Sequence, residues 1–374
     1  MRSGVIAIAF AFAHVLVSAV DGDAAGGRPP LRLETVTFAG DSATFTGTIA
    51  WPSRAGLVPA LVMLHGSEPG RRDGLPAQGL RERLVPRGIA VLSFDKRGVG
   101  GSSGRYREMP DLREAASDGL AALRYLASRP EVDSMRVGVY GASQGGWVGP
   151  LMASRSPRVA FVVSVSGPGV TPREQSRFED GSRLREAGLD DGDVAEVDSL
   201  RDALIAYWER GEGAARDRAR SLWRAALTRP WFDVAVRVDP LFSRLGRLAA
   251  PPAPSQMPRE YFELLAHMRY DPVPAAERVR VPVLHVYGAG DRHLPVEESV
   301  RRLRPAYRRA GNRDVTFDVL PRAGHGLQAL TGDHECVSCP PDSARASWRL
   351  APGAAELVDR WLLDRASRRA PAAR

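Results

Sequence analysis

The sequence predicts an α/β fold in which a mostly parallel central sheet is flanked by helices. Three observations support this prediction: short continuous apolar runs recur along the chain, helical stretches separate them, and only the first two strand-like segments alternate apolar and polar residues. Continuous apolar runs are typical of strands buried on both faces, and their alternation with helices is typical of parallel sheets. A helical cap insertion and an N-terminal β-hairpin complete the predicted architecture.

The hairpin is predicted from residues 31–38 and 43–50, which alternate around the turn at Gly40–Ser42. Buried strands are expected at residues 60–64, 89–94, 136–140, 160–165, 281–287 and 315–320. Helices are expected to include residues 111–127, 145–154 and 297–310.

The helical cap is predicted at residues 171–277, which have helical periodicity and no strand-like run. It divides the core into a first part at 30–170 and a second part at 278–374. Most of the large aromatic residues in the cap are expected to form its own core, and one or two to line a substrate pocket. These residues include Tyr207, Trp208, Trp223, Trp231, Phe232, Tyr261 and Phe262.

The charge and the N-terminus predict an exported protein that does not bind nucleic acid. The net charge is +8, but Lys96 is the only lysine, and the arginines are spread along the chain instead of forming one basic stripe. Residues 1–19 have the profile of a signal peptide, with cleavage expected after Ala19 and a periplasmic or secreted location. The alternative is an uncleaved N-terminal anchor, which is the only membrane contact that we expect.

The two cysteines, Cys336 and Cys339, leave three interpretations open. Export favours a local disulfide, and free thiols are the second interpretation. A structural zinc site ranks third, because it needs four ligands and the chain has no second cysteine pair. No metal ion or cofactor is expected, a prediction that rests on the motifs of the chain and on the family that it resembles.

The strongest chemical signal is Val137-Gly-Val-Tyr-Gly-Ala-Ser-Gln-Gly-Gly146, a buried strand that runs through Gly-x-Ser-x-Gly into a helix. This pattern is typical of a nucleophile elbow, in which the serine occupies a sharp turn and needs small neighbours. The helix that follows directs its N-terminal dipole at the reacting centre. Ser143 is therefore the candidate nucleophile.

A serine nucleophile needs a histidine base and a carboxylate, which follow it in the order Ser, Asp, His in this kind of site. Asp291 lies just after the strand predicted at 281–287, and His325 lies between two glycines after the strand predicted at 315–320. Asp318 is the rival acid, but it lies inside a strand. None of the other histidines matches both the order and the loop context; they are His14, His65, His267, His285, His293 and His334.

An oxyanion hole is expected from two backbone N–H groups. Ser67 follows the first buried strand in His65-Gly-Ser67, and Gln144 follows the nucleophile directly. The glycine-rich segment 94–104 does not have the spacing of a dinucleotide fingerprint or a P-loop, and no His-Glu-x-x-His motif occurs.

With these motifs in order, the chain resembles the α/β-hydrolase superfamily over nearly all of its mature length. Segments 65–73, 94–103, 141–146 and 159–169 are similar to the bacterial serine aminopeptidase-like and dienelactone-hydrolase-like esterases. The resemblance implies a helical cap after the fifth or sixth core strand and a metal-independent hydrolase of esters, thioesters or some amides. In this group a histidine commonly precedes the nucleophile, whereas Ala142 does so here; this position is outside the triad.

The first functional hypothesis is a serine hydrolase that cleaves carboxylic esters of small molecules through an acyl-enzyme intermediate. The enzymatic alternatives are a thioesterase and an aminopeptidase-type peptidase acting on short peptides. The peptidase needs a carboxylate subsite in the cap, for which Glu174, Glu179 and Asp180 are candidates. A binding protein on a hydrolase scaffold is the non-enzymatic alternative, although such proteins usually lack a triad residue.

Overall fold

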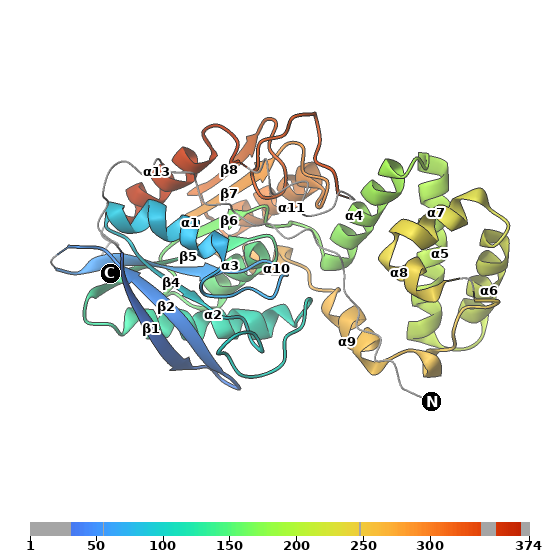
Figure 1. Ribbon diagram of the computed structural model, residues 1–374, viewed down its shortest axis with the longest axis horizontal. Helices are drawn as coiled ribbons and strands as arrows, with labels where there is room; N and C mark the ends of the chain where they lie inside the picture. The colour runs from blue at the N-terminus through green and yellow to red at the C-terminus, as the bar shows by residue number, and fades with distance from the viewer. Residues whose placement is uncertain (1–30, 55, 247, 338–348, 368–374) are drawn as a thin grey trace.

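A computed structural model describes residues 31–54, 56–246, 248–337 and 349–367. The protein has an eight-stranded sheet. Figure 1 shows this sheet between two layers of helices, with a purely helical lobe beside it. The strand order is β1-β2-β4-β3-β5-β6-β7-β8. The strands are β1 Arg32–Ala39, β2 Thr44–Trp51, β3 Val58–Leu64, β4 Ala90–Phe94, β5 Val132–Ala142, β6 Val162–Val165, β7 Val283–Gly288 and β8 Val315–Leu320.

The sheet is parallel except at its N-terminal edge. Strand β2 pairs antiparallel with both β1 and β4, whereas all neighbours from β4 to β8 are parallel. The predicted hairpin and the predicted parallel sheet are therefore confirmed. Because the carboxyl ends of parallel strands meet at one edge, the loops after β3, β5, β7 and β8 converge there.

Helices cover both faces of the sheet. On one face lie α1 (Leu75–Leu84) and α13 (Ala354–Ser367), and on the other lie α2 (Leu112–Ala127), α3 (Gln144–Arg155), α10 (Val273–Ala276) and α11 (Val296–Arg309). A short 3₁₀ helix, Val85–Arg87, continues α1.

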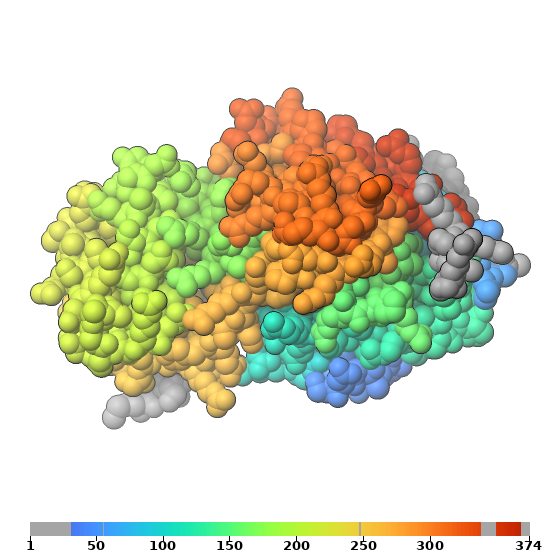
Figure 2. Space-filling model, turned by 180° about the vertical axis from the view of Figure 1, so that it is seen from behind, coloured from blue at the N-terminus to red at the C-terminus, as the bar shows by residue number. Residues whose placement is uncertain are grey.

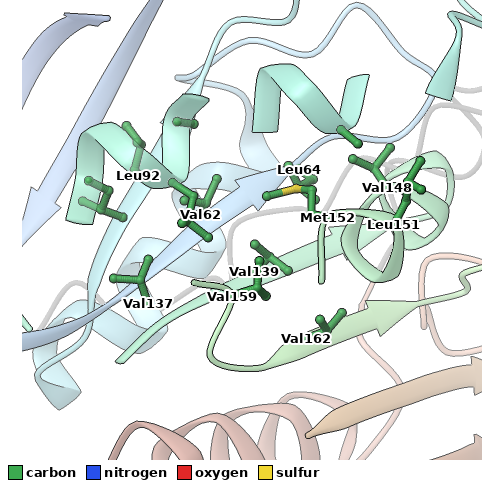
Figure 3. Close-up of a cluster of buried hydrophobic side chains, with 14 of the residues drawn as sticks. Val62, Leu64, Leu92, Val137, Val139, Val148, Leu151, Met152, Val159 and Val162 are labelled. Carbon is green, nitrogen blue, oxygen red and sulfur yellow. The ribbon is translucent and has the colours of Figure 1, made fainter. Parts of the chain in front are cut away.

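Buried apolar side chains alternate between the two faces, as a strand requires. In β3, Val62 and Leu64 belong to the cluster under α2 and α3, whereas Leu61 and Met63 belong to the cluster under α1 and α13. Figure 3 shows the first cluster, in which Met152 of α3 lies close to Leu64. These continuous apolar runs are buried on both faces, which explains their prediction from sequence.

The chain between β6 and β7 is helical throughout its described residues. It forms α4 Pro172–Glu186, α5 Asp191–Arg210, α6 Ala214–Ala226, α7 Pro230–Val238, α8 Pro240–Leu245, the 3₁₀ helix Pro254–Gln256, α9 Arg259–His267 and then α10. Thr171 begins α4 with a capping box, in which its hydroxyl accepts from Glu174 N and the Glu174 carboxylate accepts from Thr171 N. Figure 2 shows helices α4 to α9 as a lobe joined to the core across a narrower waist.

The lobe has a hydrophobic core of its own. Of the seven aromatic residues named from the sequence, six are buried, and Phe262 packs against that core while partly exposed. Trp208 packs edge-on against Tyr261, and Trp223 packs edge-on against Phe232. None of the seven lines the cavity that contains Ser143, so the expectation that one or two line a substrate pocket finds no support there.

Candidate active site

Ser143 occupies a strained turn between β5 and α3. Its φ is 52° and its ψ is −114°, a conformation that L-residues rarely adopt. A Cβ on Gly141 would lie 2.1 Å from the Gly145 carbonyl oxygen, and one on Gly145 would lie 2.8 Å from that of Leu64. Close backbone packing therefore requires the two glycines of Gly-x-Ser-x-Gly, and it holds Ser143 in this turn.

His325 and Asp291 form a buried hydrogen-bonded pair. The distance from His325 Nδ1 to Asp291 Oδ2 is 2.8 Å, and both side chains are almost fully buried. A proton on Nδ1 donates to the carboxylate and leaves Nε2 as the base, as a catalytic triad requires. His325 and Ser143 line the same cavity. The structure therefore brings the three predicted triad residues to one edge of the sheet.

The Asp291 carboxylate is stabilised in its charged form. Its second oxygen accepts hydrogen bonds from the backbone N–H groups of His293 at 2.8 Å and Leu294 at 3.2 Å. Burial acts to raise the pKa of Asp291, but the charge and hydrogen bond of His325, together with His293, lower it below its usual value. An ionised Asp291 can therefore orient the imidazole at neutral pH.

The loop that carries His325 is held by two residues that sequence reasoning missed. Glu335 accepts hydrogen bonds from His325 N at 2.9 Å and from Arg292 N at 2.9 Å, so it joins the base loop to the acid loop. Ser166, just after β6, donates its hydroxyl to the His325 carbonyl oxygen at 2.6 Å. Both are buried. Glu335 lies in no recognisable motif, and Ser166 lies in segment 159–169, whose resemblance assigns it no role, so only the folded chain reveals them.

A second histidine, His293, lines the same cavity and was also missed. Its ring centroid is 5.0 Å from that of His325, and its Nδ1 is 3.0 Å from Oε1 of Glu179, which comes from α4 of the cap. Burial opposes protonation, but Glu179 and Glu335 raise the pKa of His293 to about 9. His293 therefore carries a positive charge at neutral pH and connects the cap to the site.

Both residues that are predicted to supply the oxyanion donors lie near the nucleophile. Ser67 lines the cavity with Ser143, and Gln144 is the first residue of α3, where a backbone N–H has no acceptor inside the helix. The Gln144 side chain accepts from Lys96 Nζ at 3.0 Å and donates to the Glu108 carbonyl oxygen at 2.7 Å. These two contacts hold Gln144 in place, and with it the backbone N–H that is predicted to bind the oxyanion.

The cavity itself is small, at about 40 Å³. This volume holds only a few water molecules. A second cavity of about 60 Å³ lies beyond His65 and Gln144, and Phe94, Lys96 and Tyr106 form part of its wall.

The remaining candidate residues have other roles in the fold. His285 is fully buried in β7, where burial lowers its pKa to about 3, and His65 binds the Phe94 carbonyl oxygen at 2.8 Å. Asp318 lies inside β8. In the glycine-rich segment 94–104, the Asp95 carboxylate accepts from Gly101 N at 2.8 Å, so this loop is folded on itself.

Three further predictions concern regions that are described only in part. Residues 1–19 and Cys339 lie outside the described residues, so the signal peptide and export stay predictions. Cys336 is disulfide-bonded.

Among the described helices, none combines the length and apolarity needed to cross a bilayer. Within the same residues, no group of three or more His, Cys, Asp or Glu side chains is arranged to hold a metal ion.

Fold and site together define a serine hydrolase of the α/β-hydrolase type, which confirms the resemblance seen in the sequence. The chain belongs to the X-Pro dipeptidyl-peptidase (S15) family, whose model matches residues 41–309.

Among solved structures, Est1E from Butyrivibrio proteoclasticus with bound ferulic acid has a TM-score of 0.51 at 15% identity, over 89% of this chain and 100% of that chain. DcsB in complex with its substrate analogue also has a TM-score of 0.51, at 18% identity, over 90% of this chain and 100% of that chain. At these identities the likeness shows the shared fold alone.

Two curated relatives match shorter stretches. The quorum-quenching protein AidA of Acinetobacter baumannii is 36% identical over 113 residues, which are 30% of this chain and 36% of that protein. The thiohydrolase aneE of Aspergillus aculeatus is 33% identical over 154 residues, which are 41% of this chain and 44% of that protein. The chain thus spans less than half the length of either relative.

Proposed function

We propose that this protein hydrolyses carboxylic esters through an acyl-enzyme intermediate. The observation that carries the proposal is the buried His325–Asp291 hydrogen bond. His325 lines the same cavity as Ser143, which occupies a strained turn. Ser143 Oγ attacks the ester carbonyl carbon while its proton passes to His325 Nε2. The resulting oxyanion accepts hydrogen bonds from the N–H groups of Ser67 and Gln144.

The rest of the cycle follows from the same groups. The tetrahedral intermediate collapses, the C–O bond to the alcohol breaks, and His325 returns its proton to the departing oxygen. Water then attacks the acyl-serine carbonyl, His325 accepts a proton from that water, and the acid leaves as Ser143 regains its hydrogen. Asp291 keeps the imidazolium oriented throughout and stays ionised.

The cap carboxylates argue against a peptidase that would bind a substrate ammonium group there. Glu174 caps α4 and pairs with Arg302 at 2.7 Å. Glu179 binds His293 and Arg183, and Asp180 pairs with Arg183 at 3.1 Å. Each of the three carboxylates expected for an aminopeptidase subsite is thus already neutralised by a cation of the chain.

A dipeptidyl-peptidase activity is the second candidate, and two observations favour it. The S15 family model matches most of the chain. In addition, Glu68 lines the Ser143 cavity, and its partly exposed carboxylate lies 3.8 Å from His65 Nδ1. Glu68 is therefore the carboxylate best placed for a substrate ammonium group. A thioester would be cleaved by the same steps as an ester, with a thiol as leaving group.

The test is labelling of the purified protein with a fluorophosphonate probe, beside Ser143→Ala. We expect labelling of the wild type and none of the variant, because only an activated serine attacks the probe. Turnover of p-nitrophenyl esters should exceed that of aminoacyl-prolyl p-nitroanilides. Faster anilide turnover would favour the dipeptidyl-peptidase, and an unlabelled, folded wild type would contradict both hydrolase candidates.

A further inference from the structure

Lys96, the only lysine of the chain, contacts both halves of the proposed oxyanion hole. From the loop after β4, its Nζ donates to the Gly66 carbonyl oxygen at 2.7 Å and to Gln144 Oε1 at 3.0 Å. Gly66 precedes one of the two backbone donors, and Gln144 carries the other. A single ammonium group therefore bridges two segments that are far apart in the sequence.

The contact with Gly66 fixes the orientation of one peptide group. The Gly66 carbonyl and the Ser67 N–H belong to the same planar unit, and in a trans peptide they point in opposite directions. The described residues contain no cis peptide bond. Because Nζ holds the carbonyl oxygen on one side, the Ser67 N–H is aimed to the other. A rotation of this peptide would turn an oxygen toward the hole and break the Lys96 contact.

The contact with Gln144 fixes the second donor. Both ends of its side-chain amide are bound, the oxygen by Lys96 and the nitrogen by the Glu108 carbonyl oxygen at 2.7 Å. The first residue of α3 is thereby tied to the Gly66 loop. Tyr106 supports the same loop, because its hydroxyl donates to the Ser67 carbonyl oxygen at 2.5 Å.

The charge of Lys96 is set by the groups around it. Its Nζ lies 5.5 Å from the centroid of the Tyr106 ring. Burial lowers the pKa of Lys96 to about 8, against the opposing effect of the carboxylates of Glu68 and Glu108. His65 is the other titratable group whose charge interacts with it. Lys96 is therefore mostly protonated at neutral pH and loses its proton under mildly alkaline conditions.

We propose that Lys96 is a positioning residue that holds both backbone donors of the oxyanion hole in their productive orientation. This inference rests on the proposed hydrolase function, and it assigns Lys96 no contact with the substrate. Removing the ammonium group should therefore weaken stabilisation of the transition state and leave ground-state binding almost unchanged.

The rate of fluorophosphonate labelling tests this role without knowledge of the substrate, because the phosphoryl oxygen of the reacting probe occupies the oxyanion hole. We expect Lys96→Met to lower the labelling rate, and kcat for the best ester, by about 10² to 10³-fold, the effect of losing one oxyanion donor. KM should change by less than about threefold. Lys96→Arg, which retains a cation and N–H donors, should recover part of the rate.

Arg97→Met is the matched control. Arg97 is the next residue of the same loop, and it pairs with Asp118 at 3.0 Å without a hydrogen bond to Gly66 or Gln144. We expect this variant to melt at a lower temperature but to be labelled within about threefold of the wild-type rate. An equal loss of labelling rate in Arg97→Met and Lys96→Met would mean that any disturbance of this loop slows labelling. That result would overturn the proposal.

A pH profile gives a second readout, which needs no Lys96→Met protein. The wild-type labelling rate should fall as pH rises through about 8, where Lys96 loses its proton. His293, which also lines the cavity, titrates near pH 9. Lys96→Arg separates the effect of Lys96 from that of His293, because a guanidinium stays protonated over this pH range. The labelling rate of Lys96→Arg should therefore show no decline near pH 8. A decline that persists there in Lys96→Arg would overturn the proposal.

The two proposals fail in different ways. If the folded wild type is not labelled, the hydrolase function fails, and the role of Lys96 fails with it. If the wild type is labelled and Lys96→Met is labelled equally fast, only the role of Lys96 is overturned.

Discussion

Each oxygen of the Asp291 carboxylate has its own task. One oxygen accepts hydrogen bonds from the backbone N–H groups of His293 and Leu294, and the other accepts a hydrogen bond from Nδ1 of His325. An asparagine at this position would keep the size and the first set of contacts. Its amide group could donate to Nδ1, which would place the imidazole proton on Nε2 and remove the base.

Asp291→Asn should therefore lower kcat for the best ester by roughly 10⁴-fold, with a small change in thermal stability. Asp318→Asn is the control, because Asp318 is a carboxylate of β8 outside the triad; its kcat should stay within about twofold of the wild type. Steady-state kinetics beside thermal melting checks both. A loss of less than about tenfold in Asp291→Asn would show that another group orients His325.

At the residue scale, the sequence predicts those residues whose role leaves a local pattern. Ser143 needs glycines on both sides, so its motif is visible without the fold. Glu335, Ser166 and His293 act through contacts that leave no such pattern. Ser166 and His325 are 159 positions apart in the chain, and a hydroxyl bound to a carbonyl oxygen can occur anywhere in a sequence.

At the scale of helices and strands, an element whose apolar residues follow a regular pattern is easy to predict from the sequence. An element that buries a charged side chain on its apolar face is harder to predict. Strand β8 has the bounds predicted for it, Val315–Leu320. Helix α1 is not among the helices named from the sequence, and Arg81 occupies a position on its otherwise apolar buried face. That side chain is nonetheless buried, and it donates to the Arg72 carbonyl oxygen at 2.6 Å.

Helix α4 is held to the core by the Glu179–His293 pair, whose strength depends on pH. The folded state raises the pKa of His293 from 6.5 to about 9, so the stabilisation is fully present below pH 6.5 and is lost as pH rises through 9. A rise of this size corresponds to about 3 kcal/mol.

His293→Asn should therefore lower the free energy of unfolding markedly at pH 6 and much less at pH 9.5. Urea unfolding of the wild type and the variant at both pH values measures the difference. Titratable groups that have no contact with His293 or with the Glu179 network affect both proteins alike and cancel. An equal difference at both pH values would mean that His293 stabilises the fold as a neutral side chain.

At the scale of the whole molecule, the protein has separate hydrophobic cores. Two apolar clusters line the faces of the sheet, and a third fills the cap. Leu264 of α9 packs against both the cap cluster and the cluster under α2 and α3. The sequence predicts this division, because strand-like runs stop at the cap, but the contacts between the parts follow from the fold alone.

Separate cores should unfold with different sensitivity to mutation. Trp223 is fully buried in the cap, where its indole N–H donates to the Leu248 carbonyl oxygen at 2.9 Å. Trp223→Ala should cost about 3–5 kcal/mol through the cavity it leaves. Amide hydrogen exchange should then rise in α5, α6 and α7, while the central strands β3 and β5 stay protected. Equal loss of protection in the strands would show instead that the cap and the sheet unfold as one cooperative unit.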